Sequence, residues 1–290
     1  MPIEITNLSH VYMPDSPFKT TAIHDINLDV MQGEFIGLIG HTGSGKSTLI
    51  QHMNGLLKPT SGAIFVDGHD LTDKKTDLRS IRKRVGLVFQ YPEYQLFEET
   101  VALDIAYGPK NLGLSQDEID ERVSTAASQL GLDEATLAQS PFELSGGQKR
   151  RCAIAGVLAM QPDVLILDEP IAGLDPRGRE EMLGLLTNLH EQRGCTMVMV
   201  SHAMDDVARL CSRILVMNQG TLAMQGTPDE VFARGDELIQ MGLGLPEGAQ
   251  LARALRDKGF DIPAGIWKTQ DLAEALIKLL PLKGGDADAR

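Results

Sequence analysis

One eight-residue stretch restricts the fold of this 290-residue chain more than any other, because glycines and a lysine recur there at fixed intervals. Residues 40–47 read Gly-His-Thr-Gly-Ser-Gly-Lys-Ser. The apolar residues 35–39 come directly before them, and the residues from Lys46 to Gly55 have a helical pattern that stops at the glycine. A strand, a glycine-rich loop and a helix in this order form a P-loop, in which backbone N–H groups and the helix N-terminus face phosphate oxygens. We therefore expect a nucleotide at this loop.

The P-loop pattern also assigns chemistry to particular side chains. Lys46 is expected to reach the β- and γ-phosphates, and Ser47 to bind Mg²⁺, which prefers oxygen ligands. A glycine-rich turn without a ligand is the alternative, and the flanking strand and helix disfavour it. The residues that we expect to bind ATP through this loop are Gly40, His41, Thr42, Gly43, Ser44, Gly45, Lys46, Ser47 and Thr48.

Two carboxylates follow a second apolar segment. Residues 164–167 are continuously apolar, as in a parallel strand that is covered on both faces, and Asp168 and Glu169 come next. Because ligands bind at the carboxyl ends of strands in open α/β sheets, we expect both carboxylates beside the P-loop. Asp168 would bind Mg²⁺ through its water shell, and Glu169 would polarise the attacking water. A solvated acidic turn is the alternative interpretation of this pair.

The rest of the pattern indicates an α/β sheet domain with two additions. Strands alternate with helices over residues 1–234, with antiparallel strands near the start. Helices replace strands over about residues 101–160, which predicts an inserted helical subdomain. Residues 235–290 form a small C-terminal extension with two amphipathic segments, and we expect the polar tail from Lys283 to Arg290 to be disordered.

Composition limits the partners of the chain. Asp and Glu number 40 against 27 Lys and Arg, which gives a net charge of −13 and disfavours binding to a nucleic-acid backbone. Cys152, Cys195 and Cys211 form no C-x-x-C pair, so we expect small buried hydrophobes in a reducing compartment. About 18 consecutive apolar residues, as a membrane-spanning helix needs, occur nowhere.

A second glycine-containing loop precedes another helical pattern. Residues 144–148 read Leu-Ser-Gly-Gly-Gln, and with the other motifs in order this stretch resembles the signature of the ATP-binding cassette (ABC) ATPases. The resemblance implies a P-loop NTPase core with an antiparallel β subdomain and an inserted helical subdomain. The further motifs that carry it are Gln90, Asp168-Glu169, Gly173-Leu174-Asp175 and His202.

The resemblance also implies what these motifs do. Two cassettes close around two ATP molecules, and the signature of one binds the γ-phosphate of the other through Ser145, Gly146, Gly147 and Gln148. Gln90 is expected to contact Mg²⁺ and the attacking water, beside the membrane partner. His202 would hydrogen-bond the γ-phosphate and hold the water, so that Glu169, His202 and Gln90 are the expected catalytic residues.

In similar proteins an aromatic residue before the P-loop stacks on adenine. Tyr12 fits this role best, Phe18 is its rival, and a place in the core is the alternative for either. Ile171 stands where a hydroxyl residue is common in such proteins, which leaves the tuning of its loop open.

A narrower resemblance concerns the segments around Gln90 and the signature. Residues 88–97 (Val-Phe-Gln-Tyr-Pro-Glu-Tyr-Gln-Leu-Phe) and 107–111 are similar to those of energy-coupling factor (ECF) transporter ATPases of the cobalt and vitamin type. Residues 91–93 and 141–144 resemble the second of their two ATPase subunits, and the C-terminal extension would assist dimer contact. Packing within the helical subdomain is the alternative for these stretches.

This narrower resemblance implies an ATP hydrolase that energises uptake of a vitamin or another micronutrient. Its partners would be a second ATPase, a membrane scaffold (T component) and a substrate-binding membrane (S) component, with the chain peripheral on the cytoplasmic face of the cell membrane. An ordinary ABC importer or exporter ATPase is the alternative. An ABC ATPase acting on DNA or ribosomes is disfavoured by the charge and by the short distance between Gly45 and Leu144.

Overall fold

A mainly parallel sheet of six strands lies at the centre of the computed structural model, which describes residues 2–279. Strand β3 is paired in parallel with β8 on one side and β9 on the other, and only β10 is antiparallel to its neighbour. In spatial order the strands are β10 (Thr221–Gly226), β9 (Arg213–Asn218), β3 (Phe35–Gly40), β8 (Thr196–Val200), β7 (Val164–Asp168) and β6 (Val85–Val88).

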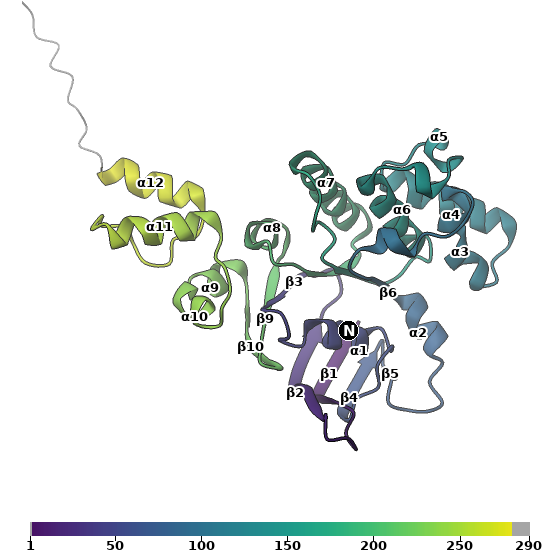
Figure 1. Ribbon diagram of the computed structural model, residues 1–290, viewed down its shortest axis with the longest axis horizontal. Coiled ribbons are helices and arrows are strands. Elements are labelled where there is room, and N and C mark those ends of the chain that lie inside the picture. Colours follow the sequence, from purple (N-terminus) through teal and green to yellow (C-terminus); the bar gives the residue numbers. More distant parts are fainter. Residues whose placement is uncertain (1, 280–290) are drawn as a thin grey trace, which may run out of the picture.

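A second, antiparallel sheet packs against one face of the first, together with helix α1 (Figure 1). Side chains alternate along β3, so Ile36 and Leu38 join the core under the antiparallel sheet, while Phe35 and Ile39 join the core under the helices. In spatial order, the strands of this antiparallel sheet are β2 (Thr20–Val30), β1 (Ile3–Tyr12), β4 (Ser61–Val66) and β5 (His69–Asp70).

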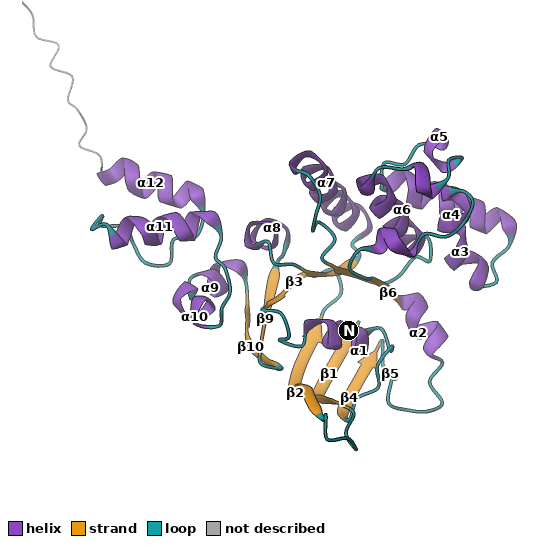
Figure 2. Ribbon diagram, in the orientation of Figure 1, coloured by secondary structure: helices purple, strands orange, loops and turns teal. Residues whose placement is uncertain are grey.

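Helices gather on the other side of the central sheet, as the purple ribbons of Figure 2 show. Helix α6 packs against α3, α4 and the short segment η1, and it also contacts strand β6, so it connects the helical group to the sheet. The helices and 3₁₀ segments of the first 232 residues are α1 (Lys46–Met53), α2 (Leu78–Arg84), η1 (Pro92–Gln95), α3 (Val101–Asn111), α4 (Gln116–Gln129), α5 (Glu134–Leu137), η2 (Pro141–Glu143), α6 (Gly146–Leu158), α7 (Pro176–Arg193), α8 (Met204–Leu210) and α9 (Pro228–Phe232).

Three more helices follow at the C-terminal side: α10 (Gly235–Gln240), α11 (Glu247–Asp257) and α12 (Thr269–Leu279). Helices α11 and α12 share a small core of their own around Ala252, Ile262 and Leu272. The tail from Lys283 to Arg290, for which we predicted disorder, lies outside the described residues. Within residues 2–279, no helix is both long and apolar enough to cross a lipid bilayer.

Candidate nucleotide site

A cavity of about 500 Å³ opens at the carboxyl ends of the central parallel strands. Six parts of the chain line it, and five of them contain a residue that the sequence predicted for the site. They are Tyr12, the P-loop with Lys46, Gln90, the pair Asp168 and Glu169, and His202. Strand β2 adds Thr20, Thr21 and Ala22, which no sequence motif indicated.

Glycines shape the P-loop because no other residue fits its backbone. Gly43 and Gly45 have φ angles of 80° and 102°, in the left-handed region that L side chains rarely adopt. A Cβ on Gly45 would lie 2.6 Å from Cγ2 of Ile23 and 2.8 Å from the carbonyl oxygen of Ala22. Gly45 is also the N-cap residue of α1 and has no side chain to accept the first N–H groups of the helix. Those donors suit phosphate oxygens.

Lys46 is held inside this loop by backbone carbonyl groups. Its Nζ donates to the carbonyl oxygens of Gly40 (2.5 Å) and His41 (3.0 Å). Burial lowers the pKa of Lys46, and the charges of Glu169 and Asp168 oppose that effect. A triphosphate could replace the two carbonyl oxygens as acceptors for the ammonium group of Lys46.

Three predicted members of the P-loop lie at its edge rather than in the cavity lining. Gly40 ends strand β3, and its carbonyl group binds Lys46. The His41 ring turns back on its own loop, with Nδ1 2.7 Å from the carbonyl oxygen of Thr42. Ser44 Oγ is buried and has no hydrogen-bond partner in the described part of the chain. These three residues therefore belong to the loop but not to the wall of the cavity.

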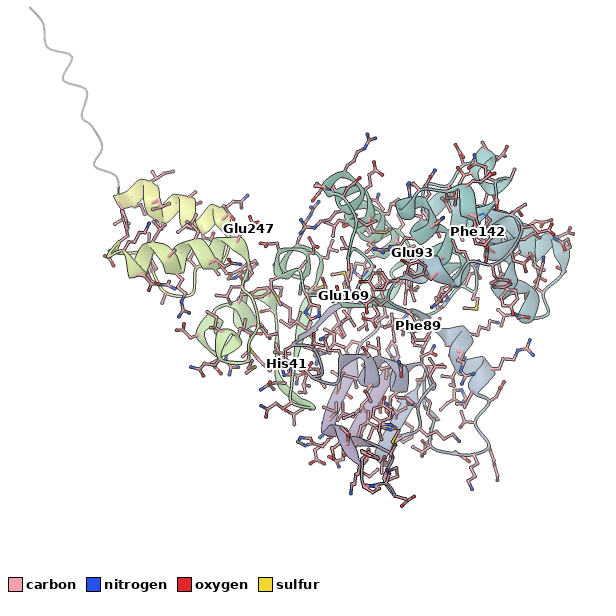
Figure 3. All side chains as sticks on the ribbon, in the orientation of Figure 1. His41, Phe89, Glu93, Phe142, Glu169 and Glu247 are labelled. Atoms are coloured by element: carbon pink, nitrogen blue, oxygen red, sulfur yellow. The ribbon has the colours of Figure 1, made fainter. Side chains whose placement is uncertain are left out.

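The two carboxylates lie where β7 ends, as the strand pattern predicted. Asp168 is the last residue of β7, and Glu169 follows with a φ of 52°, a strained value for a non-glycine residue. The Glu169 N–H donates to the carbonyl oxygen of Val200 (3.0 Å), which ties this turn to the end of β8. In the view of Figure 3, Glu169 lies near the centre of the molecule, between His41 and Glu93.

Burial governs the electrostatics of these groups. It raises the pKa of Glu169 to about 7, with a further contribution from the neighbouring charge of Asp168. Burial also raises the pKa of Asp168, and Lys46 opposes this. The Glu169 side chain is only 12% exposed, and its Oε1 is 3.4 Å from Nε2 of His202 without a hydrogen bond. Glu169 is thus a carboxylate whose pKa lies near neutrality, as a general base requires.

The two candidates for the aromatic residue that stacks on adenine lie in different surroundings. Tyr12 lines the cavity, and its hydroxyl group lies 3.3 Å from Oγ1 of Thr48 in helix α1. Phe18 does not line the cavity and is 79% exposed. Of the two, only Tyr12 is positioned beside the P-loop.

The signature loop lies outside this cavity, at the N-terminus of α6. Ser145 Oγ accepts from the Gln148 N–H (3.3 Å), and Gln148 Oε1 accepts from the Ser145 N–H (3.0 Å), which forms a capping box. Phe142, three residues earlier in the chain, lies among the helices and away from Glu169 in Figure 3. The structure therefore brings together all the predicted site residues except those of the signature.

One buried residue near the site was missed from the sequence. Arg150 forms two hydrogen bonds with Glu93, Nη2–Oε1 at 2.7 Å and Nε–Oε2 at 3.1 Å, and its side chain is only 4% exposed. Its Nη1 donates to the carbonyl oxygens of Ala172 (2.5 Å) and Pro170 (3.3 Å), just after Glu169. In the sequence Arg150 stands in a run of polar residues, which is typical of a solvated helix face.

Comparison with known proteins identifies this arrangement. The ABC transporter family matches residues 23–172. The energy-coupling factor transporter ATP-binding protein EcfA2 of Clostridium tetani is 56% identical, over 96% of this chain and 97% of that protein. EcfA2 of Symbiobacterium thermophilum is also 56% identical, over 99% of both chains.

Solved structures agree with these sequence relatives. The CbiO1 protein of Clostridium perfringens, part of the ABC transporter complex CbiONQ, has a TM-score of 0.74 at 39% identity and covers 87% of this chain and 98% of that chain. A dimeric ATP-binding cassette bound to ADP and phosphate has a TM-score of 0.70 at 30% identity, with 78% of this chain and 98% of that chain covered.

Proposed function

The chain belongs to the ABC transporter family and, within it, to the EcfA2 ATP-binding proteins of energy-coupling factor transporters, and from this membership we propose how its residues use ATP. It is an ATP-binding and ATP-hydrolysing transporter subunit. It works with a second ATPase subunit, a membrane scaffold and a substrate-binding membrane component.

One observation carries the mechanism that we propose: the cavity is lined by the predicted catalytic and metal-binding residues, Tyr12 and most of the P-loop, but not by the signature. Ser145 and Gly146 of the signature are exposed, and the signature is already organised as the N-terminus of a 13-residue helix. A second cassette that faces this one would bring its own signature over the open cavity, and this chain's Ser145 and Gly146 would cover the partner's ATP. Two ATP molecules are then enclosed between two chains.

The triphosphate would lie along the P-loop, with Lys46 exchanging its contacts with Gly40 and His41 for the β- and γ-phosphates. Glu169 would accept a proton from the attacking water. The water oxygen forms a bond to the γ-phosphorus while the bond from that phosphorus to the β–γ bridging oxygen breaks, so ADP and phosphate leave. His202, 3.4 Å from Glu169, would hold the γ-phosphate and the water by hydrogen bonds.

Mg²⁺ is the metal that we propose for this site, because the side chains beside Lys46 offer oxygen donors. The Ser47 hydroxyl group, the Asp168 carboxylate and the Gln90 amide oxygen all come from the cavity lining. Such a set suits a hard cation that keeps several water molecules. When bound, Mg²⁺ would neutralise phosphate charge and polarise the γ-phosphate.

Tyr12 would provide the surface on which adenine stacks. Its ring lines the cavity and the residue is 39% exposed, so part of it is accessible to a ligand. Its hydroxyl group reaches Thr48, which follows the proposed Mg²⁺ ligand Ser47. This link would set the distance between the adenine end and the phosphate end of the site.

The membrane scaffold would dock in a groove of about 460 Å³ between α2, α3 and α6. Its lining includes the exposed rings of Phe97 and Tyr107, which pack edge to face at 5.0 Å, together with the cationic side chains of Arg79 and Lys83. The groove begins a few residues after Gln90, so an inserted helix would contact the segment that enters the ATP site. We propose that the chain is bound in this way to the cytoplasmic face of the cell membrane.

Residues 235–290 would act as a dimerisation extension of the ATPase domain, which we assign to residues 1–234, with its helical subdomain at about 101–160. Helices α11 and α12 leave Leu251 and Ile277 half or more exposed, at 50% and 63%. Apolar side chains on two neighbouring amphipathic helices support a contact with another chain.

The decisive experiment replaces the proposed base. Glu169→Gln keeps the size of the side chain but removes its ability to accept a proton, so the full-length chain should bind ATP and remain in a closed, ATP-bound dimer. Light scattering of the chain with its partner ATPase, with ATP and with ADP, detects that dimer. Glu191→Gln, the same change at an exposed position of α7, is the control and should turn over ATP normally.

Hydrolysis by Glu169→Gln at the native rate would refute the assigned role. The partners are tested separately by purifying the intact membrane complex and identifying its subunits. Recovery of a second ATPase with a scaffold and a substrate-binding membrane protein supports the assignment, whereas recovery with a separate extracellular-type binding protein would contradict it.

A further inference from the structure

Three aromatic rings, beginning with Tyr12 in the cavity lining, form a row of edge-to-face contacts, and the mechanism above uses only Tyr12. His10 of β1 lies against Tyr12, with ring centroids 4.5 Å apart and planes at 78°. His10 also contacts His52 of α1, with ring centroids 4.7 Å apart and planes at 71°. His10 is 9% exposed and His52 is fully buried. The two imidazoles therefore support the Tyr12 ring, which we propose to stack on adenine.

Hydrogen bonds fix the orientation of both imidazoles. His52 Nδ1 is 2.7 Å from the carbonyl oxygen of Thr48, and His10 Nδ1 is 3.1 Å from that of Lys58. Because a carbonyl oxygen only accepts, each Nδ1 carries the proton and each ring is held in one tautomer. Burial lowers the pKa of His52, which keeps this inner ring neutral.

The contacts close a circle through the P-loop helix. Tyr12 contacts His10, His10 contacts His52, His52 bonds to the backbone of Thr48, and the Thr48 hydroxyl group lies 3.3 Å from that of Tyr12. Strand β1 carries one half of this circle and helix α1 the other. The angle of the Tyr12 ring is thus fixed relative to the helix that would bind the phosphates.

Two buried histidines are costly unless they do something that an aliphatic residue could not. His52 Nε2 is buried and lacks a hydrogen-bond partner in the described chain, and such an unsatisfied group disfavours the folded state. Leucine at either position would fill space without this cost. A leucine, however, would not present a flat ring edge whose plane is set by a hydrogen bond, which is what an edge-to-face contact with Tyr12 requires.

We propose that His10, supported by His52, is a positioning residue that holds the Tyr12 ring in the orientation needed to stack on adenine. This inference rests on the proposed role of Tyr12. It predicts that the histidine pair contributes to binding of the adenine base and not to binding of the phosphates. An edge-to-face aromatic contact corresponds to about a three- to tenfold change in affinity.

The test compares a ligand with adenine and one without it, on the full-length chain in the presence of Mg²⁺. Calorimetry measures the Kd of ADP and that of inorganic tripolyphosphate. His10→Ala should weaken ADP about three- to tenfold and leave tripolyphosphate binding unchanged. His10→Phe restores an aromatic edge and should return the ADP affinity to within about twofold of native. His24→Ala, at an exposed position of β2, is the matched control.

Tyr12→Ala separates this inference from the proposal that it rests on. If Tyr12→Ala leaves ADP binding unchanged, the adenine platform itself is wrongly assigned. If Tyr12→Ala weakens the binding of ADP but His10→Ala does not, Tyr12 stacks on adenine without help from His10, and the positioning role is refuted. If His10→Ala lowered the affinities for ADP and tripolyphosphate equally, His10 would have a general structural role, and this result would also overturn the inference. In the Tyr12→Ala background, His10→Ala should have no further effect.

Discussion

Replacing Glu169 should stabilise the folded chain in the absence of nucleotide, and by an amount that depends on pH. Burial and the charge of Asp168 raise the pKa of Glu169 from 4.5 to about 7. Each pH unit between the folded and unfolded pKa corresponds to about 1.4 kcal/mol, so ionising Glu169 costs the folded state about 3 kcal/mol. Glu169→Gln removes that charge from a side chain that is only 12% exposed.

The sign of this effect follows from proton binding. Between pH 4.5 and about 7 the folded state holds the Glu169 proton more tightly than the unfolded state does. The native protein therefore loses stability as pH rises through this window, and the full penalty is present above it. The advantage of Glu169→Gln over the native chain should then be largest near pH 8 and vanish near pH 4.5.

Urea denaturation of the nucleotide-free, Mg²⁺-free chain at several pH values measures this difference. Glu191→Gln is again the control, and its effect should stay below about 0.5 kcal/mol at every pH, as for other exposed substitutions. An advantage of Glu169→Gln that is the same at pH 5 and pH 8 would refute the reasoning, because the effect would then not come from the buried charge. A loss of stability at pH 8 would refute it as well.

Two further substitutions test the structure around the site. Arg150→Ala leaves Glu93 buried without its cation and should lower the free energy of unfolding by about 3 kcal/mol, measured by urea denaturation, with partial recovery when Glu93→Gln is added. Gly45→Ala places a Cβ 2.6 Å from Ile23 at a φ of 102° and should reduce ADP affinity at least about tenfold, measured by calorimetry. Gly113→Ala, at a φ of 79° with open space around it, isolates the cost of the backbone conformation alone.

Local signals in the sequence predicted much of the fold. The order of strand, glycine loop and helix around Lys46, and the apolar run before Asp168, indicated the central sheet, and the predicted ABC ATPase fold is confirmed by structures of that family. Helix α2 was missed because it is short and buries only Ile81, which leaves no amphipathic period to detect. The predicted domain boundaries and the roles of the site residues stay predictions.

The start of α6 shows a different limit. The sequence placed the whole loop of residues 144–148 before a helical pattern, whereas the helix begins within that loop, at Gly146. Two glycines disfavour a helix by propensity, but the capping box between Ser145 and Gln148 satisfies the first N–H groups and offsets that cost. A pairing between two side chains therefore decided the boundary, and propensity alone could not reveal it.

Arg150 joins three parts of the site that lie far apart in the sequence. Its guanidinium group lies one turn into the signature helix, yet its partners are Glu93 of η1, after Gln90, and the carbonyl groups of Pro170 and Ala172, after Glu169. A buried ion pair adds little net stability, since removing two charges from water offsets their attraction. We expect the Arg150–Glu93 pair to act instead by holding these segments in one arrangement. A shift of the signature helix toward a partner's ATP would therefore pull on the turn that carries Glu169 and on the segment beside the docking groove. Closure of the signature over the partner's ATP and the position of Glu169 in this chain's own site would then be linked through the side chain of Arg150.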